Sequence, residues 1–117
     1  MVNVYGIPNC DTVKKALSWL KENNVAFEFH DFKKGTLGVD RIKSWIKASA
    51  LEKVLNKKST AYRNLSAEDQ QKTSIANEAI SLMHTNTNLI KRPVVEIAGT
   101  VLHGFNEEEY KKAFGKN

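Results

Sequence analysis

The sequence predicts an α/β fold with a mixed four-stranded sheet and an inserted helical segment. Near the N-terminus, two β-rich segments flank an amphipathic stretch, which predicts a parallel βαβ unit. Near the C-terminus, two further β-rich segments are separated by a tight turn and precede another amphipathic stretch. Helical periodicity fills the chain between these regions. We therefore expect one domain over residues 1–117, with a helical insertion at about 38–85.

Composition supports a small globular domain and narrows the choice of partners. The 117 residues are 41% hydrophobic, which is enough for one continuous core. Lysine and arginine outnumber the acidic residues by 18 to 13, a mild excess that favours anionic ligands. Because the basic residues are spread along the chain instead of being concentrated among aromatic residues, we expect no direct contact with nucleic acid.

Other features indicate a reduced, cytoplasmic protein. No apolar run approaches ~18 residues and residues 1–5 lack the regions of a signal peptide, so we expect no membrane association. The sole cysteine, Cys10, has no partner for an internal disulfide. The three histidines have no metal-ligand spacing, so we expect no metal site and no bound cofactor.

The first three elements follow from local patterns. Residues 2–5 alternate in polarity and end at Gly6, which predicts a strand. The next segment is a predicted helix, for which Asp11 and Thr12 are candidate caps. Its apolar residues recur on one face: Val13, Ala16, Leu17 and Leu20. Residues 25–32 are rich in β-branched and aromatic side chains, which predicts the second strand.

Helices are predicted for most of the middle of the chain. Residues 39–49 form one amphipathic stretch and residues 51–55 a shorter one. A third helix is expected to begin at Ser66 and to continue unbroken to about His84. The expected core face of this helix comprises Ile75, Ala76, Ala79, Ile80 and Met83.

The C-terminal region predicts a hairpin and a final helix. Residues 94–97 and 100–103 are predicted strands, joined by a tight turn at Ala98 and Gly99. Asn106 is expected to cap the last helix, whose apolar residues are Tyr110, Ala113 and Phe114. The resulting order, β-α-β, a helical insertion and then β-β-α, is the thioredoxin arrangement.

Four side chains outside the apolar stripes receive mainly structural interpretations. Trp19 and Trp45 each lie one position off a stripe, so we expect both to pack at the flanks of their helices. His30 is interpreted as a core or edge histidine of the second strand. His103, near the end of the last predicted strand, is placed where it could approach a site at that end of the sheet.

Cys10 is the candidate catalytic residue because it lies where the first strand gives way to the first helix. A thiol attacks as the thiolate, whereas an ordinary cysteine is mostly protonated near neutrality. Unpaired amides and the positive end of the helix dipole favour an anion at this point. Asn9, Asp11 and Thr12 are therefore expected to help bind the anionic group of a substrate. A lone cysteine is also a common small buried residue, which is the competing interpretation.

Arg92 and Pro93 precede the third predicted strand and are the second candidate feature. A proline at this position is a common device at a strand edge. In a thioredoxin-like domain, a cis proline here would instead lie against the active cysteine and leave backbone groups for an extended thiol substrate. Arg92 would then point toward the anion site.

Three separated segments resemble the arsenate reductase (ArsC)/Spx family, and in particular its YffB-type branch of proposed glutathione-dependent thiol reductases. The segments are Tyr5–Ala16, Leu55–Leu65 and Ile90–Val94. The resemblance spans nearly the whole chain and implies a thioredoxin-like fold with an inserted helical region. It also implies a nucleophilic cysteine at Cys10 and an arginine before a cis proline at Arg92–Pro93. Glutathione is the implied co-substrate, and glutaredoxin is a candidate partner.

The chain departs from the arsenate reductase pattern at the oxyanion site. Those enzymes carry a histidine and a serine at the positions of Gly6 and Val13, and three arginines of which Arg92 matches one. Asn56 and Gly104 stand near the other two. The resemblance makes Lys58 and Arg63, with Lys57, candidates to replace part of that charge, although lysine lacks the bidentate fork of arginine. We therefore expect little turnover of arsenate.

Two functions follow from the resemblance. The favoured one is a thiol-dependent oxidoreductase in which Cys10 forms a mixed disulfide with glutathione or a similar small thiol, which an external thiol then resolves. The alternative is a transcriptional regulator of the Spx type that binds RNA polymerase. Many Spx proteins switch through a Cys-x-x-Cys pair, and because Val13 occupies the second cysteine position that switch is excluded here.

Overall fold

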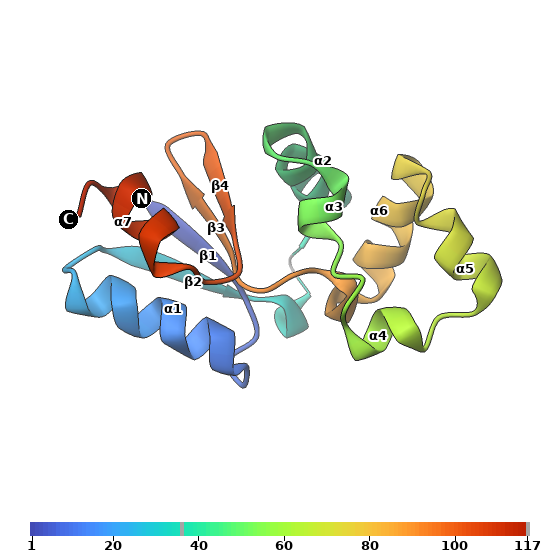
Figure 1. The fold of residues 1–117 in the computed structure, drawn as a ribbon, viewed down its shortest axis with the longest axis horizontal. Coiled ribbons are helices and arrows are strands. Elements are labelled where there is room, and N and C mark those ends of the chain that lie inside the picture. Colours follow the sequence, from blue (N-terminus) through green and yellow to red (C-terminus); the bar gives the residue numbers. More distant parts are fainter. Residues whose placement is uncertain (36, 117) are drawn as a thin grey trace. The chain divides into compact units, whose positions relative to one another are not determined.

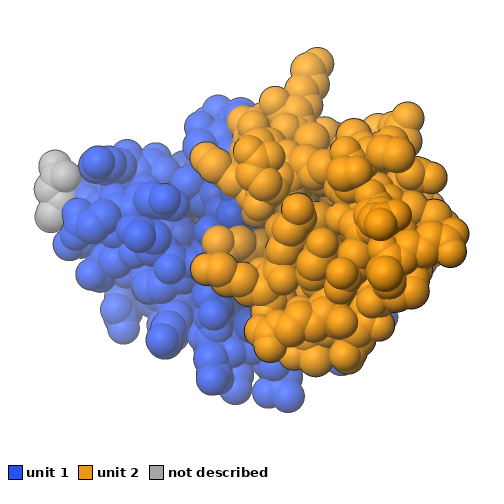
Figure 2. Space-filling model, turned by 45° about the vertical axis from the view of Figure 1, so that its right-hand side comes forward, with its two compact units in different colours: residues 1–35, 92–117 blue, residues 36–91 orange. Residues whose placement is uncertain are grey.

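The computed structural model describes residues 1–35 and 37–116 of the 117-residue chain. The chain forms two compact units, which Figure 2 shows in different colours. Residues 1–35 and 92–117 make one unit from the two ends of the chain, and residues 36–91 make the other. Each unit is described separately below.

The unit made from the chain ends contains a mixed four-stranded sheet (Figure 1). Its strands are β1 (Val2–Gly6), β2 (Phe27–Asp31), β3 (Val94–Ile97) and β4 (Thr100–His103). They lie in the order β2-β1-β3-β4, with β1 parallel to β2 and every other pair antiparallel. The predicted mixed sheet is therefore confirmed. The second strand is shorter than predicted, because Phe32 already belongs to the 3-10 turn η1 (Phe32–Lys34).

Helices α1 (Asp11–Glu22) and α7 (Glu107–Phe114) pack on one face of this sheet. The strands contribute apolar side chains that lie opposite one another in the ladder, since Val4 pairs with Val95 and Val95 with Leu102. Together with the helices they form a cluster of buried residues: Val4, Ala16, Trp19, Leu20, Val95, Leu102 and Tyr110. This combination of βαβ unit, hairpin and helices is a thioredoxin-like fold.

The β3–β4 hairpin turns at Ala98 and Gly99, as predicted. Both residues have positive φ values, 45° and 84°, as a two-residue turn of the primed type requires. Asn106 caps α7 as predicted, since its side chain accepts a hydrogen bond of 3.1 Å from the amide of Glu109. Acidic residues in the first turn of α7 complement the helix dipole.

Tyr110 of α7 is fully buried in this core. Its hydroxyl donates a hydrogen bond of 2.7 Å to the carbonyl oxygen of Gly104. Burial, and to a smaller extent the nearby Glu109 carboxylate, raises the pKa of Tyr110 well above its ordinary value of 10.0. The native protein therefore holds this proton at pH values where an unfolded chain releases it.

Alkaline pH is expected to destabilise the protein through Tyr110. Above about pH 10 the unfolded state loses the tyrosine proton while the native state keeps it, so this group lowers the free energy of unfolding by about 1.4 kcal/mol per pH unit. Urea unfolding from pH 8 to pH 11 checks this. The wild-type and Tyr110→Phe curves of stability against pH should run parallel at pH 8–9 and converge above about pH 10. Parallel curves over the whole range would contradict the expectation.

The middle unit is helical. Its elements are α2 (Val39–Ala48), α3 (Leu51–Val54), α4 (Thr60–Arg63), α5 (Ala67–Lys72), α6 (Ala76–Thr85) and the 3-10 turn η2 (Thr87–Leu89). Helix α2 packs against α3 and α6. The segment before α4 is joined to the segment around the end of η2. An isolated β-bridge between Leu55 and Ile90 and two backbone hydrogen bonds of 2.8 Å make this connection.

The single helix predicted from Ser66 to His84 is wrong, because the structure has two helices there. Ser66 caps the first one as expected, accepting a hydrogen bond from the amide of Asp69. Helix α5 then ends in tight turns in which the hydroxyls of Thr73 and Ser74 bind carbonyl groups three residues earlier. Ile75 precedes α6 and is 55% exposed, and Ala76 is exposed too, so neither belongs to the core.

Both tryptophans lie deeper than predicted. Trp19 is 5% exposed within the α1–α7 core, and Trp45 of α2 is fully buried. An indole is wide enough to reach the interior from a position beside the apolar stripe, so periodicity alone places it too far out. Helix α2 accordingly buries Ile42 and Trp45, whereas Val39 and Ile46 are only half-buried.

No helix in the described residues is both long enough and apolar enough to cross a membrane. Within residues 1–35 and 37–116, no group of three or more histidine, cysteine, aspartate or glutamate side chains is arranged to hold a metal ion.

Candidate functional site

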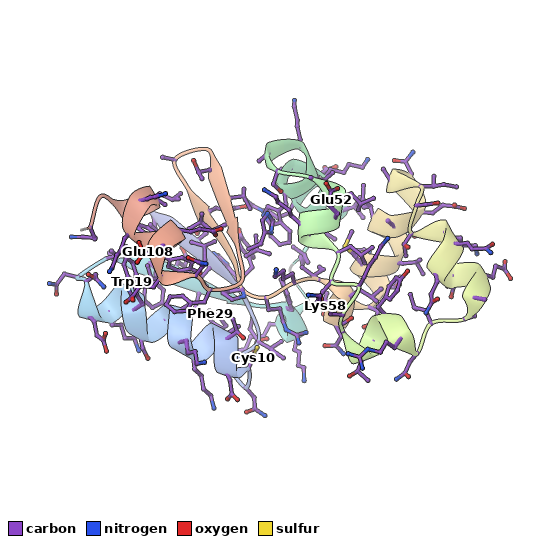
Figure 3. All side chains as sticks on the ribbon, in the orientation of Figure 1. Cys10, Trp19, Phe29, Glu52, Lys58 and Glu108 are labelled. Atoms are coloured by element: carbon purple, nitrogen blue, oxygen red, sulfur yellow. The ribbon has the colours of Figure 1, made fainter. Side chains whose placement is uncertain are left out.

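Cys10 occupies the N-cap position of α1, at the end of the loop that follows β1 (Figure 3). Its backbone is extended, with φ −139° and ψ 124°, and its carbonyl accepts the first helical hydrogen bond, 2.9 Å from the amide of Lys14. The predicted caps, Asp11 and Thr12, are instead the first two helical residues. The thiol is partly exposed and makes no capping hydrogen bond. Burial of Cys10 as an apolar core residue is therefore excluded.

The first turn of α1 presents its amides on the side of Cys10. The amides of Asp11, Thr12 and Val13 have no carbonyl four residues earlier within the helix to bind. These N–H groups and the positive end of the helix dipole stabilise negative charge close to the sulfur. Asn9 and the carboxylate of Asp11 are exposed, so solvent and salt weaken the opposing charge of Asp11.

The Arg92–Pro93 segment belongs to the same compact unit as Cys10. Its peptide bond is cis, as the family resemblance implied. Pro93 is buried, and its carbonyl accepts a hydrogen bond of 2.8 Å from the amide of Gly104. Arg92 is half-buried. Pro93 is thus held in place from the β4 side of the sheet.

Gly6, the last residue of β1, lies where three parts of the site meet. A methyl group added at its Cα would lie 2.9 Å from Cγ2 of Val13 and 3.9 Å from Cα of Pro93. The end of β1, the first turn of α1 and the Arg92–Pro93 segment therefore pack closely around this glycine. Because Cys10 follows Gly6 by four residues and precedes Val13 by three, it lies on the loop between these contacts.

Gly6→Ala is expected to lower the free energy of unfolding by about 1–3 kcal/mol, because the stiff, buried side chain of Val13 occupies the required space. Val13→Ala removes the obstructing methyl groups. The same glycine substitution should therefore cost less than about 0.5 kcal/mol in a Val13→Ala background. Urea unfolding of the four proteins of this cycle measures both values, and equal costs in the two backgrounds would refute the steric explanation.

Lys58 and Arg63 lie in the middle unit, on the segment leading into and through α4. The amide of Lys58 donates to Oδ1 of Asn56 at 3.1 Å, and the Arg63 guanidinium donates to the carbonyl of Lys58 at 2.8 Å. Arg63 thus braces the loop that carries Lys58, and both side chains are exposed. The grouping of these cations with Cys10 stays a prediction.

His30 lies on the edge strand β2, within the structural role predicted for it. Its ring stacks on Tyr5 at 4.5 Å, and its Nε2 lies 3.0 Å from Oδ1 of Asn3. The hydroxyl of Tyr5 donates to Glu96 at 3.4 Å. His103 pairs with Val94 in the β3–β4 ladder, one register position from Pro93, and its approach to the site stays a prediction.

Gly104 and Tyr110 support the Arg92–Pro93 segment, a role that was not predicted from the sequence. Gly104 has a φ of 73° and binds the carbonyl of Pro93, and Tyr110 binds the carbonyl of Gly104. A glycine directly after the last predicted strand was the available signal for Gly104. No local sequence pattern indicates which group a tyrosine hydroxyl binds.

The fold and the placement of Cys10 define a thioredoxin-like domain with a thiol at the start of its first helix. Residues 5–113 match the model of the ArsC family, and the chain belongs to that family. It is 42% identical over 115 residues to an uncharacterized protein of Haemophilus influenzae, a match covering 97% of this chain and 99% of the relative.

Further comparisons extend this assignment. The solved structure of a protein named YFFB superimposes with a TM-score of 0.87 and 36% identity, covering 97% of this chain and 98% of that one. The global transcriptional regulator Spx of Lactiplantibacillus plantarum is 25% identical over 114 residues, covering 96% of this chain and 85% of the regulator. The resemblance to the ArsC/Spx family and to YffB-type proteins is therefore confirmed.

Proposed function

We propose that the protein is a thiol-dependent oxidoreductase that uses glutathione, with Cys10 as its nucleophile. The observation that carries this proposal is the partly exposed thiol at the N-cap of α1, free of any capping hydrogen bond and next to the amides of the first turn. Those amides are donors that an anionic group of a substrate can bind beside the sulfur. The chemistry needs neither a metal nor a bound cofactor.

The reaction is a thiol–disulfide exchange in two steps. The Cys10 thiolate attacks one sulfur of a disulfide that contains glutathione, a new S–S bond forms to Cys10, and the other sulfur leaves as a thiolate. An external thiol, glutathione itself or a glutaredoxin, then attacks this mixed disulfide and releases Cys10. Because the chain has no second cysteine, resolution within the molecule is excluded. Such a cycle suits the reducing cytoplasm.

The substrate is bound through its negative charges. Glutathione carries carboxylates, and the amides of α1 together with Arg92 supply donors and positive charge for them. The proposal assigns binding of the anionic group also to Asn9, Asp11 and Thr12, and it assigns to the buried Pro93 the lining of the substrate groove.

Mass spectrometry of the protein after exposure to glutathione disulfide tests the proposal. We expect one glutathione adduct on Cys10, lost on addition of reduced glutathione and absent in Cys10→Ser. At pH 7 iodoacetamide should alkylate Cys10 in the wild type, because the thiol is partly exposed. A thiol that iodoacetamide alkylates but that forms no glutathione adduct would end the proposal.

A regulatory role like that of Spx is the second candidate. It is supported by several Spx relatives, such as one of Streptococcus mutans with 26% identity over 95% of this chain. The role predicts binding to RNA polymerase that is independent of Cys10. A pull-down with the C-terminal domain of the polymerase α-subunit distinguishes the two functions: capture of both wild type and Cys10→Ser supports the regulator, and capture of neither removes it.

A further inference from the structure

We propose that Tyr110 is a positioning residue for the thiol site, because it ties the Arg92–Pro93 segment to the helix that begins at Cys10. The proposal rests on the thiol chemistry proposed for Cys10. It assigns to α7, the last helix of the chain, a role in the reaction with a bulky disulfide. Tyr110 itself is buried in the core and does not touch the reacting sulfur.

The first connection is a chain of two hydrogen bonds. The Tyr110 hydroxyl donates to the carbonyl of Gly104 at 2.7 Å, and the amide of Gly104 donates to the carbonyl of Pro93 at 2.8 Å. All three residues are buried, so water does not replace either bond without cost. Gly104 makes both hydrogen bonds with a φ of 73°. This left-handed conformation is favourable for glycine and unfavourable for most other residues.

The second connection runs through the aromatic ring of Tyr110. The ring meets the indole of Trp19 on α1 edge to face, with the centroids 5.5 Å apart. It also contacts Phe105, the residue after Gly104, at 4.9 Å. Aromatic pairs in this geometry add about 0.5–1.5 kcal/mol beyond the burial of their surface. Tyr110 thus contacts α1 with its ring and binds Gly104 with its hydroxyl, and Gly104 in turn binds Pro93.

The two connections can be separated by one substitution. Tyr110→Phe keeps the ring, and with it the packing against α1, but removes the donor to Gly104. The carbonyl of Gly104 then lacks this partner, and the hold on Pro93 loosens. Burial raises the pKa of Tyr110, so the wild-type hydroxyl is a hydrogen-bond donor throughout the physiological pH range.

Two reagents report on the two halves of the site. Glutathione disulfide must fit against the Arg92–Pro93 segment as well as reach the sulfur, whereas iodoacetamide needs only the sulfur. We expect Tyr110→Phe to react about three- to tenfold more slowly with glutathione disulfide, the range that the loss of one hydrogen bond implies, and within about twofold of wild type with iodoacetamide. The Tyr110→Phe substitution should raise the glutathione disulfide concentration that gives half of the limiting rate. The limiting rate itself should stay unchanged.

Tyr62→Phe in the middle unit is the matched control, since it makes the same chemical change far from this chain of hydrogen bonds in the sequence. Both of its rates should equal those of wild type. Amide hydrogen exchange gives an independent measure: Tyr110→Phe should speed exchange at Gly104 by about tenfold or more, while the amides of Val4 and Val95 in the sheet keep their protection.

The possible outcomes distinguish this proposal from the one on which it rests. An unchanged exchange rate at Gly104 overturns the positioning role whatever Cys10 does. An unchanged ratio of the two reagent rates also overturns it, as does a parallel fall of both rates, which would reflect general destabilisation. If wild-type Cys10 forms no glutathione adduct, the proposed function fails, and the exchange at Gly104 alone decides whether Tyr110 positions the segment.

Discussion

Replacing Arg92 by alanine is expected to slow the reaction of Cys10 with glutathione disulfide by about 10- to 100-fold. This range corresponds to the loss of a hydrogen bond to a charged group, worth about 1.5–3 kcal/mol. Arg92 precedes the buried Pro93, which packs against Gly6 in the same unit as Cys10. The guanidinium is therefore proposed to bind a carboxylate of glutathione in a bidentate manner. Stopped-flow or quenched mass spectrometry at pH 7 gives the rate constants.

Two variants and one reagent make this test specific for the guanidinium. Arg92→Lys should recover only part of the rate, because lysine keeps the charge but loses the fork. Lys91→Ala removes the neighbouring exposed charge and should stay within about twofold of wild type, as expected of a screened surface cation. Alkylation by iodoacetamide should change little in all three proteins. Equal slowing in Lys91→Ala and Arg92→Ala would reduce the role of Arg92 to net charge alone.

Trp45→Ala is expected to lower the free energy of unfolding by about 3–5 kcal/mol, the largest stability effect predicted for a single substitution here. Trp45 heads the largest fully buried side chains of the described residues, and its helix packs against α3 and α6. Its removal leaves a cavity that these short helices have few ways of filling. Denaturation by guanidinium chloride, followed by circular dichroism, measures the loss.

Lys43→Ala on an exposed position of the same helix is the control and should change stability by less than about 0.5 kcal/mol. Trp45→Phe should fall between the two variants, because the phenyl ring fills part of the space. A Trp45→Ala protein as stable as the control would show that the middle unit does not depend on this side chain.

The sheet and its turns could be predicted from the sequence because their signals are local. Alternating residues end at Gly6, and the Ala98–Gly99 pair lies between two short β-rich segments. Asn106 and Ser66 cap the helices they precede, as their side-chain chemistry favours. Each of these features is determined within a few residues, so propensity and periodicity suffice.

The middle unit was harder to predict because competing local interactions decide its breaks. Helical periodicity continues through residues 73–75, yet side-chain hydrogen bonds of Thr73 and Ser74 to the preceding carbonyls end α5 there. Helix α4 has only four residues, too few to produce a periodic signal, and the polar loop before it masks its start at Ser59. Trp45 is buried by tertiary packing that a helical stripe does not encode.

Part of the candidate site could likewise be predicted from the sequence, and part could not. Cys10 and the Arg92–Pro93 pair were predicted from their positions next to strands and from the family resemblance, and the cis peptide bond is present. The contacts of Gly6 with Val13 and Pro93, and the hydrogen bonds from Tyr110 through Gly104, join residues that are distant in sequence or meet only through the fold. No single-sequence pattern reports such contacts.

The unit that holds Cys10 is built from the two ends of the chain, with β1 between β2 and β3 in the sheet. During synthesis on the ribosome, β1 and the thiol emerge before Pro93, β3 and α7. At a synthesis rate of about 5–20 residues per second, the side of β1 that pairs with β3 stays unpaired for on the order of 5–20 s. Residues 36–91 are continuous and complete before then. The Cys10 loop is therefore synthesised well before the Arg92–Pro93 segment, whose Pro93 packs near Gly6 in the folded unit.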